Sequence, residues 1–397
     1  MCTNKIVIKN PTLDYKLSDA LQLQVPCGKC YECRRKKASD IETRVYNQMT
    51  WNSRNGYKNY FCTLTYDECS IARLVCDGQE VLVFDREKWR LFIQNLQKQL
   101  KREYGIGRRG VMPGINYLVC SEKGGKYGRP HHHVVFGVPD VVTPDHLHAL
   151  VKRYWQGELL QDDLGNEICR GNGYVFPRYC SPSRTKKGFE IIGDPASAAK
   201  YVSKYICKDM SFFQDNQELA EYIDFYKAIK KSSDPASDEY DDADTILTEL
   251  KPYMPFWTCT QNYGLHILDD LIGDNDLETV ENVKRGVKIG RYSKRLQSYV
   301  YEYRPVPQYL RLKMLYDIRY IKRDDKTLVR YDLNKLGILY KQLIYDEQVQ
   351  ATMKFYENAY VLAKINGYDP ARSIVTSEID FKLLAVYKLT FKDRILP

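Results

Sequence analysis

Two histidines spaced two residues apart, His131 and His133, are the side chains of this sequence best suited to hold one metal ion together. The apolar residues 134–136 follow them and predict a buried strand. Because side chains on a strand alternate between its faces, His131 and His133 share one face and His132 points to the other. Two imidazoles one strand step apart can bind a single ion.

A carboxylate nine residues upstream completes a candidate ligand set. Glu122 ends the apolar run 115–120, and the Gly-rich stretch 123–130 predicts a turn. A hairpin would bring Glu122 back beside the histidines, giving two nitrogens, one oxygen and several open coordination positions. This set suits Mg²⁺ or Mn²⁺ holding a phosphate better than a closed zinc site. Two ordinary strand histidines explain the pattern equally well, because short motifs often occur by chance.

Two Tyr-x-x-Lys units run in tandem within residues 199–209. On a helix, Tyr201 and Tyr205 share a face, with Lys204 and Lys208 beside them. Tyrosine is a weak nucleophile at neutral pH because its pKa is near ~10, and a neighbouring ammonium favours the phenolate. A metal on the phosphate would make the electrophile more reactive. For a lone unit, an amphipathic helix with packed aromatic rings and solvated lysines is the better explanation.

The order of these motifs is more specific than any one of them. A strand at 61–66 comes first, the His-x-His strand with its upstream Glu122 follows, and the tyrosine helix comes last. This order resembles the three-motif pattern of the HUH endonucleases that initiate rolling-circle replication. The doubled tyrosine and a Cys-rich start resemble the replication initiators of microviruses, in particular gokushovirus-like phages. The resemblance covers about residues 25–210 and, weakly, 286–310.

The resemblance implies a metal-dependent, site-specific DNA endonuclease (nickase) and strand transferase. Such an enzyme nicks and rejoins single-stranded DNA at the origin of a small circular phage genome through a 5′-phosphotyrosyl intermediate. It implies Glu122, His131 and His133 as ligands of Mg²⁺ or Mn²⁺. It implies alternating use of Tyr201 and Tyr205 as nucleophiles. We expect Lys204 and Lys208 to assist, and the DNA-contacting residues to be Thr63, Thr65, Tyr66, Arg34, Arg35, Lys36 and Lys37. Solvated basic residues at a helix start are the alternative for residues 34–37.

The sequence departs from the phage pattern in three ways. Residues 121–124 read Ser-Glu-Lys-Gly where Gly-Glu-Tyr-Gly is usual. His132 stands where an aromatic or aliphatic residue is usual, which leaves ligation by His132 open. The chain also extends further at its C-terminal end than the resemblance predicts.

Three cysteines at the start of the matching region have the spacing of a zinc site. Cys27, Cys30 and Cys33 form two overlapping Cys-x-x-Cys units. A closed site needs a fourth ligand, for which Cys2 and Cys62 are the candidates. Zinc binding and simple thiols explain the spacing equally well.

Periodicity predicts an α+β fold. We expect helices over 38–51, 86–102, 145–155 and 196–209, and strands over 60–66, 81–84, 115–122, 131–136 and 173–176. This order is the split βαβ plan, and HUH endonucleases have the same plan with a central antiparallel sheet of the ferredoxin or RRM type. We predict an N-terminal Cys-rich basic helical segment (1–56), an endonuclease core (57–212), an acidic linker (213–260) and a mainly helical C-terminal region (261–397).

Composition agrees with a nucleic-acid partner. The 397 residues include 60 Lys and Arg against 51 Asp and Glu, a net charge of +9. The N-terminus lacks the apolar stretch of a signal peptide, and no apolar run reaches the ~18 residues that span a bilayer. We expect a protein of the host bacterial cytoplasm, with its 12 cysteines reduced or metal-bound. The expected partners are single-stranded DNA, supercoiled origin DNA and the host replication helicase and polymerase, with no membrane.

Two other functions stay open. A plasmid relaxase or mobilisation protein would share the chemistry, although relaxases usually have a third histidine in place of Glu122. A non-catalytic zinc-dependent DNA-binding protein would use the three cysteines and would not need the tyrosines. No phosphate-loop motif occurs in the sequence, which argues against a fused P-loop helicase.

Overall fold

The computed structural model describes residues 5–9, 22–28, 30–76, 78–107, 114–124, 128–161, 167–177, 188–206, 212–213, 216–293, 295–323 and 326–365. The chain divides into two compact units, residues 1–313 and 314–397. The predicted mixture of helices and sheet is confirmed, and the domain boundaries proposed above stay predictions.

A five-stranded antiparallel sheet is the centre of the first unit. Its strand order is β10-β3-β7-β6-β11, and every neighbouring pair is antiparallel. The strands are β3 (Tyr57–Thr65), β6 (Asn116–Lys123), β7 (Pro130–Pro139), β10 (Val175–Phe176) and β11 (Trp257–Cys259).

The elements follow the order β3, α2, β6, β7, α3, β10 along the chain. In the sheet, the four strands of this series stand in the order fourth, first, third, second. That arrangement is the split βαβ plan that the sequence predicted. The helices that position the site are α1 (Tyr31–Arg54), α2 (Arg86–Tyr104), α3 (Pro144–Trp155) and α4 (Pro195–Ile206).

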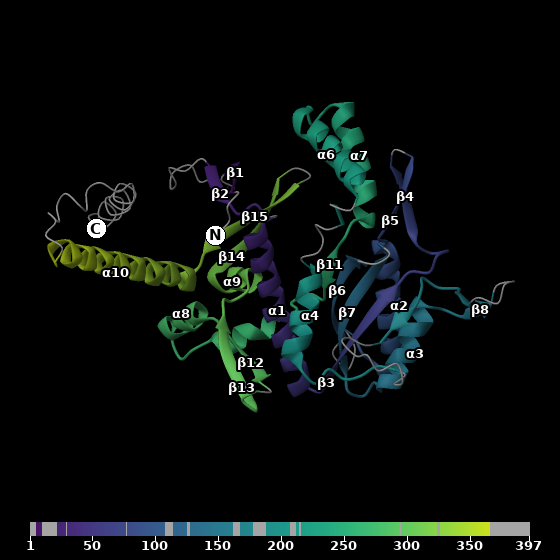
Figure 1. Ribbon diagram of the computed structural model, residues 1–397, viewed down its shortest axis with the longest axis horizontal. Coiled ribbons are helices and arrows are strands. Elements are labelled where there is room, and N and C mark those ends of the chain that lie inside the picture. Colours follow the sequence, from purple (N-terminus) through teal and green to yellow (C-terminus); the bar gives the residue numbers. More distant parts are fainter. Residues whose placement is uncertain are drawn as a thin grey trace. The chain divides into compact units, whose positions relative to one another are not determined.

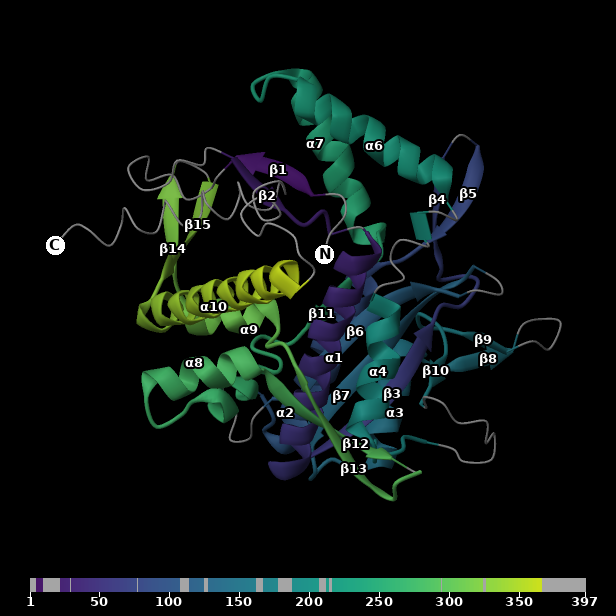
Figure 2. The ribbon, with the colours of Figure 1, turned by 60° about the vertical axis from the view of Figure 1, so that its left-hand side comes forward.

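Helices cover both faces of this sheet (Figures 1 and 2). Helices α2 and α3 pack on one face, where the apolar stripe of α2 meets the β3 and β7 side chains of the same face. Helices α1 and α4 lie side by side on the other face. The predicted helix at 86–102 is confirmed, and Asp85 caps it by accepting hydrogen bonds from the Glu87 and Lys88 amides.

A buried asparagine cluster holds α1 against the sheet. Asn52 Nδ2 donates to the side-chain oxygens of Asn59 (2.7 Å) and Asn116 (3.0 Å). Gly137 makes this possible, because a Cβ there would lie 2.1 Å from the Asn52 amide nitrogen. The predicted helix at 38–51 is therefore longer than expected and is part of the sheet's covering layer.

The stretch expected as an acidic linker contains ordered helices. It includes α6 (Gln217–Ser232), α7 (Asp238–Leu250), the 3-10 turn η1 (Lys251–Tyr253) and strand β11. The acidic run stabilises α7, because Ser237 caps its first turn and carboxylates there oppose the positive end of the helix dipole. The prediction of a loop over 231–250 was therefore wrong.

The rest of the first unit consists of short elements. After β11 come the 3-10 helix η2 (Leu265–Leu271), α8 (Asp276–Arg285), β12 (Val287–Ser293), β13 (Ser298–Arg304) and α9 (Gln308–Leu315), which reaches into the second unit. Three further two-stranded sheets pair β1 (Ile6–Lys9) with β2 (Gln22–Val25), β4 (Ala72–Cys76) with β5 (Gln79–Val83), and β8 (Leu159–Gln161) with β9 (Glu167–Cys169).

The second unit has a hairpin of β14 (Tyr316–Arg323) and β15 (Lys326–Leu333), followed by α10 (Lys335–Ile365). Helix was expected throughout from residue 310. The error has a physical cause, because Tyr316, Ile318 and Tyr320 alternate with charged residues at the two-residue period of a strand. Among the helices of the described ranges, none has a stretch long and apolar enough to span a membrane.

Candidate metal and nucleophile site

Strand register brings the predicted ligands together. Glu122 on β6 pairs directly with His131 on β7, and Thr63 on β3 pairs directly with His133. The turn between β6 and β7 thus returns the carboxylate to the histidines, as the sequence predicted. All three ligand candidates face the layer formed by α1 and α4.

The ligand atoms converge on one point. Glu122 Oε2 lies 2.9 Å from His133 Nε2 and 3.2 Å from His131 Nε2, and the two Nε2 atoms are 3.1 Å apart. Glu122 and His133 are buried, whereas His131 is partly exposed. One side of the cluster is therefore open to a substrate while the other is held in protein. This arrangement has the donor atoms to bind a divalent metal ion.

Other groups fix the orientation of both imidazoles. The Arg129 carbonyl oxygen lies 3.2 Å from His131 Nδ1, and a carbonyl only accepts, so Nδ1 donates and Nε2 keeps its lone pair. Thr63 Oγ1 lies 3.0 Å from His133 Nδ1. Such outer partners set the tautomer and aim the ligating nitrogen. Thr63 was predicted only as a DNA contact, and this contact with His133 is a role that the sequence did not reveal.

Both tyrosines of α4 lie against the histidine cluster. The Tyr205 ring stacks on the His133 ring with centroids 3.9 Å apart, and the Tyr201 ring is 6.1 Å from the His133 ring. The two tyrosine rings are 4.9 Å from each other. A tandem separated from the histidines by about seventy residues of sequence thus meets them in space. Lys204 is exposed on α4, and Lys208 lies outside the described residues.

His132 is on the opposite face of β7 and is not one of the cluster. It is fully buried, and its Nε2 lies 2.6 Å from the Tyr66 hydroxyl. Its Nδ1 has no hydrogen-bond partner among the described residues. Burial, with the neighbouring histidines as a smaller cause, lowers the pKa of His132 to about 3, so the ring is neutral. Ligation by His132 beside His131 and His133, which the sequence left open, is not possible in this geometry.

Two residues expected elsewhere are core residues. Tyr66 is 2 % exposed and packs with Trp155 and His132, so its ring cannot contact DNA in this structure. Cys62 is fully buried on the same face of the sheet and cannot complete a site with the N-terminal cysteines. Thr65, by contrast, is partly exposed and pairs directly with His131.

The three N-terminal cysteines also come together. Cys27, Cys30 and Cys33 each offer a sulfur within 4.8 Å of the others, at the start of α1. The Cys30 amide donates to Cys27 Sγ over 3.3 Å. The basic run follows in the first turns of α1, with Arg35 and Lys36 exposed and the other two, Arg34 and Lys37, half-buried.

Comparison with known proteins points to phage replication. Residues 59–210 match the model of the replication-associated protein ORF2 family. The match spans β3 through the tyrosine helix and so contains all the ligand and nucleophile candidates. The chain is similar to phage replication-associated proteins.

Two curated relatives illustrate the similarity. Replication-associated protein VP4 of Bdellovibrio phage phiMH2K is 32% identical over 140 residues, which are 34% of this chain and 39% of that protein. Replication-associated protein ORF4 of Chlamydia phage 1 is 32% identical over 116 residues, 28% of this chain and 24% of that protein. The resemblance predicted from the motifs is confirmed, although the chain spans well under half of each relative. No solved structure matches the chain.

Proposed function

We propose that this protein nicks and rejoins single-stranded DNA at the origin of a circular phage genome during rolling-circle replication. The observation that carries the proposal is the convergence of Glu122, His131 and His133 within 3.2 Å, with the Tyr205 ring stacked on His133. The similarity to phage replication-associated proteins supports it. The proposed action takes place in the host bacterial cell.

The ligand set fits a hard divalent ion. In an octahedral Mg²⁺ site with ligands at about 2.1 Å, neighbouring ligand atoms are ~3.0 Å apart. The three separations here, 2.9, 3.1 and 3.2 Å, agree with that spacing. Mg²⁺ or Mn²⁺ is therefore the proposed cofactor, and once bound it would polarise the scissile phosphate and stabilise its developing charge.

The tyrosines supply the nucleophile. The hydroxyl oxygen of Tyr201 or Tyr205 attacks phosphorus, the bond to the 3′ oxygen breaks, and a 5′-phosphotyrosyl link and a free 3′-hydroxyl result. The reverse reaction reseals the strand without ATP, because the covalent link conserves the energy of the phosphodiester. The second tyrosine allows a second cut before the first link is resealed. Lys204 and Lys208 are the proposed sources of positive charge.

The DNA must reach this site as a single strand. His131 is the partly exposed member of the cluster, and Thr65 beside it is the proposed wall of the DNA groove. A duplex would not present an isolated phosphate to so compact a site. The exposed Arg35 and Lys36, with Arg34 and Lys37, are proposed to contact the backbone. Supercoiled origin DNA and the host helicase and polymerase are the proposed larger partners.

A covalent-trapping assay tests this function. Purified protein is mixed with tiled single-stranded oligonucleotides from its replicon, with Mn²⁺ or with EDTA, and resolved on a denaturing gel. We expect a protein–DNA band that needs Mn²⁺ and disappears in the Tyr201→Phe/Tyr205→Phe variant. Tyr60→Phe, a buried tyrosine on the other face, is the matched control and should keep the band. A band that persists in the double variant would sink the proposal.

The cysteine cluster keeps a second candidate function open. A non-catalytic zinc-dependent DNA-binding protein would use Cys27, Cys30 and Cys33, whose sulfurs already lie together. It predicts stoichiometric zinc, DNA binding lost on chelation, and no adduct on any oligonucleotide. A relaxase would form the same adduct, but on the transfer origin of a plasmid.

A further inference from the structure

The hairpin β12–β13 carries a row of tyrosines that the proposed chemistry does not use. The pairing of Lys288 with Tyr303, Gly290 with Tyr301 and Tyr292 with Tyr299 puts these six side-chain positions on one face. We call this surface the aromatic ribbon face; it consists of Lys288, Gly290, Tyr292, Tyr299, Tyr301 and Tyr303.

The tyrosines of the aromatic ribbon face are exposed and regularly spaced. Each of the four is between 52% and 63% exposed. The Tyr299 and Tyr301 rings lie 6.4 Å apart at 25° to each other, and Tyr292 meets Tyr299 edge-on at 5.6 Å. The first distance is close to twice the ~3.4 Å rise of stacked bases in a DNA strand. Exposed rings in such a row offer π-faces to bases of any sequence.

Glycine and lysine shape the centre of this row. A Cβ on Gly290 would lie 2.8 Å from the Tyr301 ring, so only glycine lets that ring lie across β12. Lys288 Nζ lies 4.2 Å from the centre of the same ring. The ammonium is exposed beside an aromatic surface, a combination that suits a phosphate next to a stacked base.

The opposite face of the hairpin holds it to the first unit. Val287 and Ile289 are buried there, and Arg291 and Arg304 bind Glu42 of α1 at 2.6 and 2.7 Å. The one carboxylate of the two strands, Glu302, lies on this anchored face. The aromatic ribbon face therefore carries positive charge and no negative charge.

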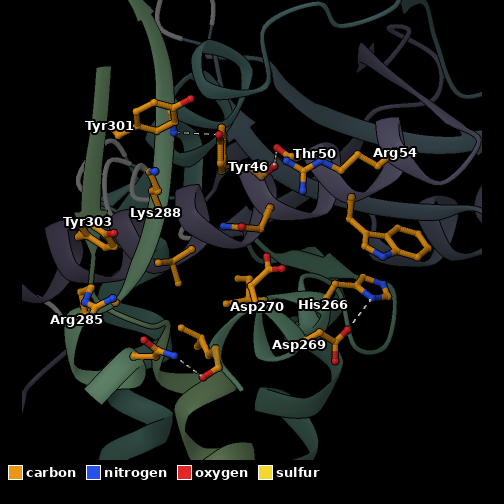
Figure 3. Close-up of a pocket in the computed structure, with 18 of the residues that line it drawn as sticks. Tyr46, Thr50, Arg54, His266, Asp269, Asp270, Arg285, Lys288, Tyr301 and Tyr303 are labelled. Atoms are coloured by element: carbon orange, nitrogen blue, oxygen red, sulfur yellow. Dashed lines mark hydrogen bonds and ion pairs between the residues drawn. The ribbon is translucent and has the colours of Figure 1, made fainter. Parts of the chain in front are cut away.

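A pocket of about 740 Å³ adjoins the aromatic ribbon face (Figure 3). Lys288, Tyr301 and Tyr303 line it from the hairpin, and the exposed Arg285 and Arg54 add two further cations. Its carboxylates, those of Asp269 and Asp270, come from η2 and not from the hairpin. Charge therefore favours a polyanion along the hairpin side of the pocket.

We propose that the aromatic ribbon face binds single-stranded DNA, with bases stacked on its tyrosines and phosphates beside Lys288 and Arg285. Strand β12 packs against α4, the helix that carries Tyr201 and Tyr205, so this surface adjoins the candidate site. It would hold DNA that flanks the nicked phosphate. A duplex hides its base faces, which is why a single strand is the expected ligand. The inference rests on the proposed function only in taking DNA as the ligand.

The test measures binding without chemistry. In the Tyr201→Phe/Tyr205→Phe background and in EDTA, fluorescence anisotropy gives the Kd for a labelled oligothymidylate of about 20 nucleotides. We expect Tyr299→Ala and Tyr301→Ala each to raise the Kd about tenfold, and the corresponding Phe variants to restore it. Lys288→Gln should lower the slope of log Kd against log salt by about 0.7. Phe225→Ala, an exposed ring on the acidic helix α6, is the matched control and should change nothing.

The outcomes separate this inference from the proposed function. An unchanged Kd for the double alanine variant overturns the inference, whether or not the wild type forms an adduct. Dissociation of a dimer by that variant, with DNA affinity intact, also overturns it and makes the face a contact between copies. A weakened Kd in the absence of any adduct from the wild type would support the ribbon site while the nicking proposal fails.

Discussion

The two faces of β7 treat neighbouring histidines differently. His132 and His133 are almost equally buried, at 0% and 4% exposure. On one face, His132 meets aromatic rings and a single hydroxyl, that of Tyr66. On the other, His133 meets a carboxylate and a second imidazole. Burial alone therefore does not distinguish a structural histidine from a ligand, and the groups that share its face do.

The largest expected difference separates the histidines of the two faces. His131→Ala or His133→Ala should weaken Mn²⁺ binding more than about a hundredfold, because each removes a donor atom, and should leave the fold intact. His132→Ala should keep Mn²⁺ binding in the folded fraction but lower the free energy of unfolding by about 2–4 kcal/mol, through a cavity and an orphaned Tyr66 hydroxyl.

Titration calorimetry and urea unfolding measure the two effects on the same preparations. Loss of Mn²⁺ binding in folded His132→Ala, with retention in His133→Ala, would reverse the comparison.

The second prediction sharpens the roles of the tyrosines on the site's face. Tyr205→Phe and Tyr201→Phe, made singly, should between them leave at least one variant that still forms the first adduct. Neither single variant should release closed circles over repeated rounds, because the second cut needs the second hydroxyl. Gel analysis of a circular template carrying two origin sites measures this. Circle release by either single variant at the wild-type rate would mean that one tyrosine does both cuts.

The third prediction concerns the support of the ligand rather than the ligand. Thr63→Val keeps the shape of the side chain and removes the hydroxyl that lies 3.0 Å from His133 Nδ1. We expect Mn²⁺ affinity to fall about 10–100-fold, as for other outer partners of metal ligands. Thr63→Ser should restore it. Equal Mn²⁺ affinity for Thr63→Val and wild type would show that packing alone orients the imidazole.

The smallest expected effect is on the core face. The Tyr60 hydroxyl is buried with no hydrogen-bond partner in the described part of the chain. Tyr60→Phe removes an unsatisfied polar group, so the free energy of unfolding should stay within about 1 kcal/mol of wild type or rise slightly. Urea unfolding checks this. A loss of more than that amount would reveal an internal partner, such as a bound water, for the hydroxyl.

Local patterns in the sequence determined much of the fold. The apolar runs and helical stripes predicted the strands and helices from β3 to α4 in the right order, since burying one face requires those periods. The same reasoning placed Glu122 beside His131 and His133, because a short Gly-rich turn can only return a strand to its neighbour. Period-two alternation at 316–320 was present in the sequence and was overlooked.

Only the tertiary structure decided which residues share a surface across long separations in the chain. Thr63 meets His133 and Tyr205 stacks on it because β3 and α4 are packed against β7, and no local period encodes that pairing. The same packing buries Tyr66, which a strand pattern alone left available to DNA. It also orders the acidic stretch before β11, since helices α6 and α7 gain from burying Leu219 and Ala243 what a linker would lose. Faces follow from local sequence, whereas partners follow from how the layers pack.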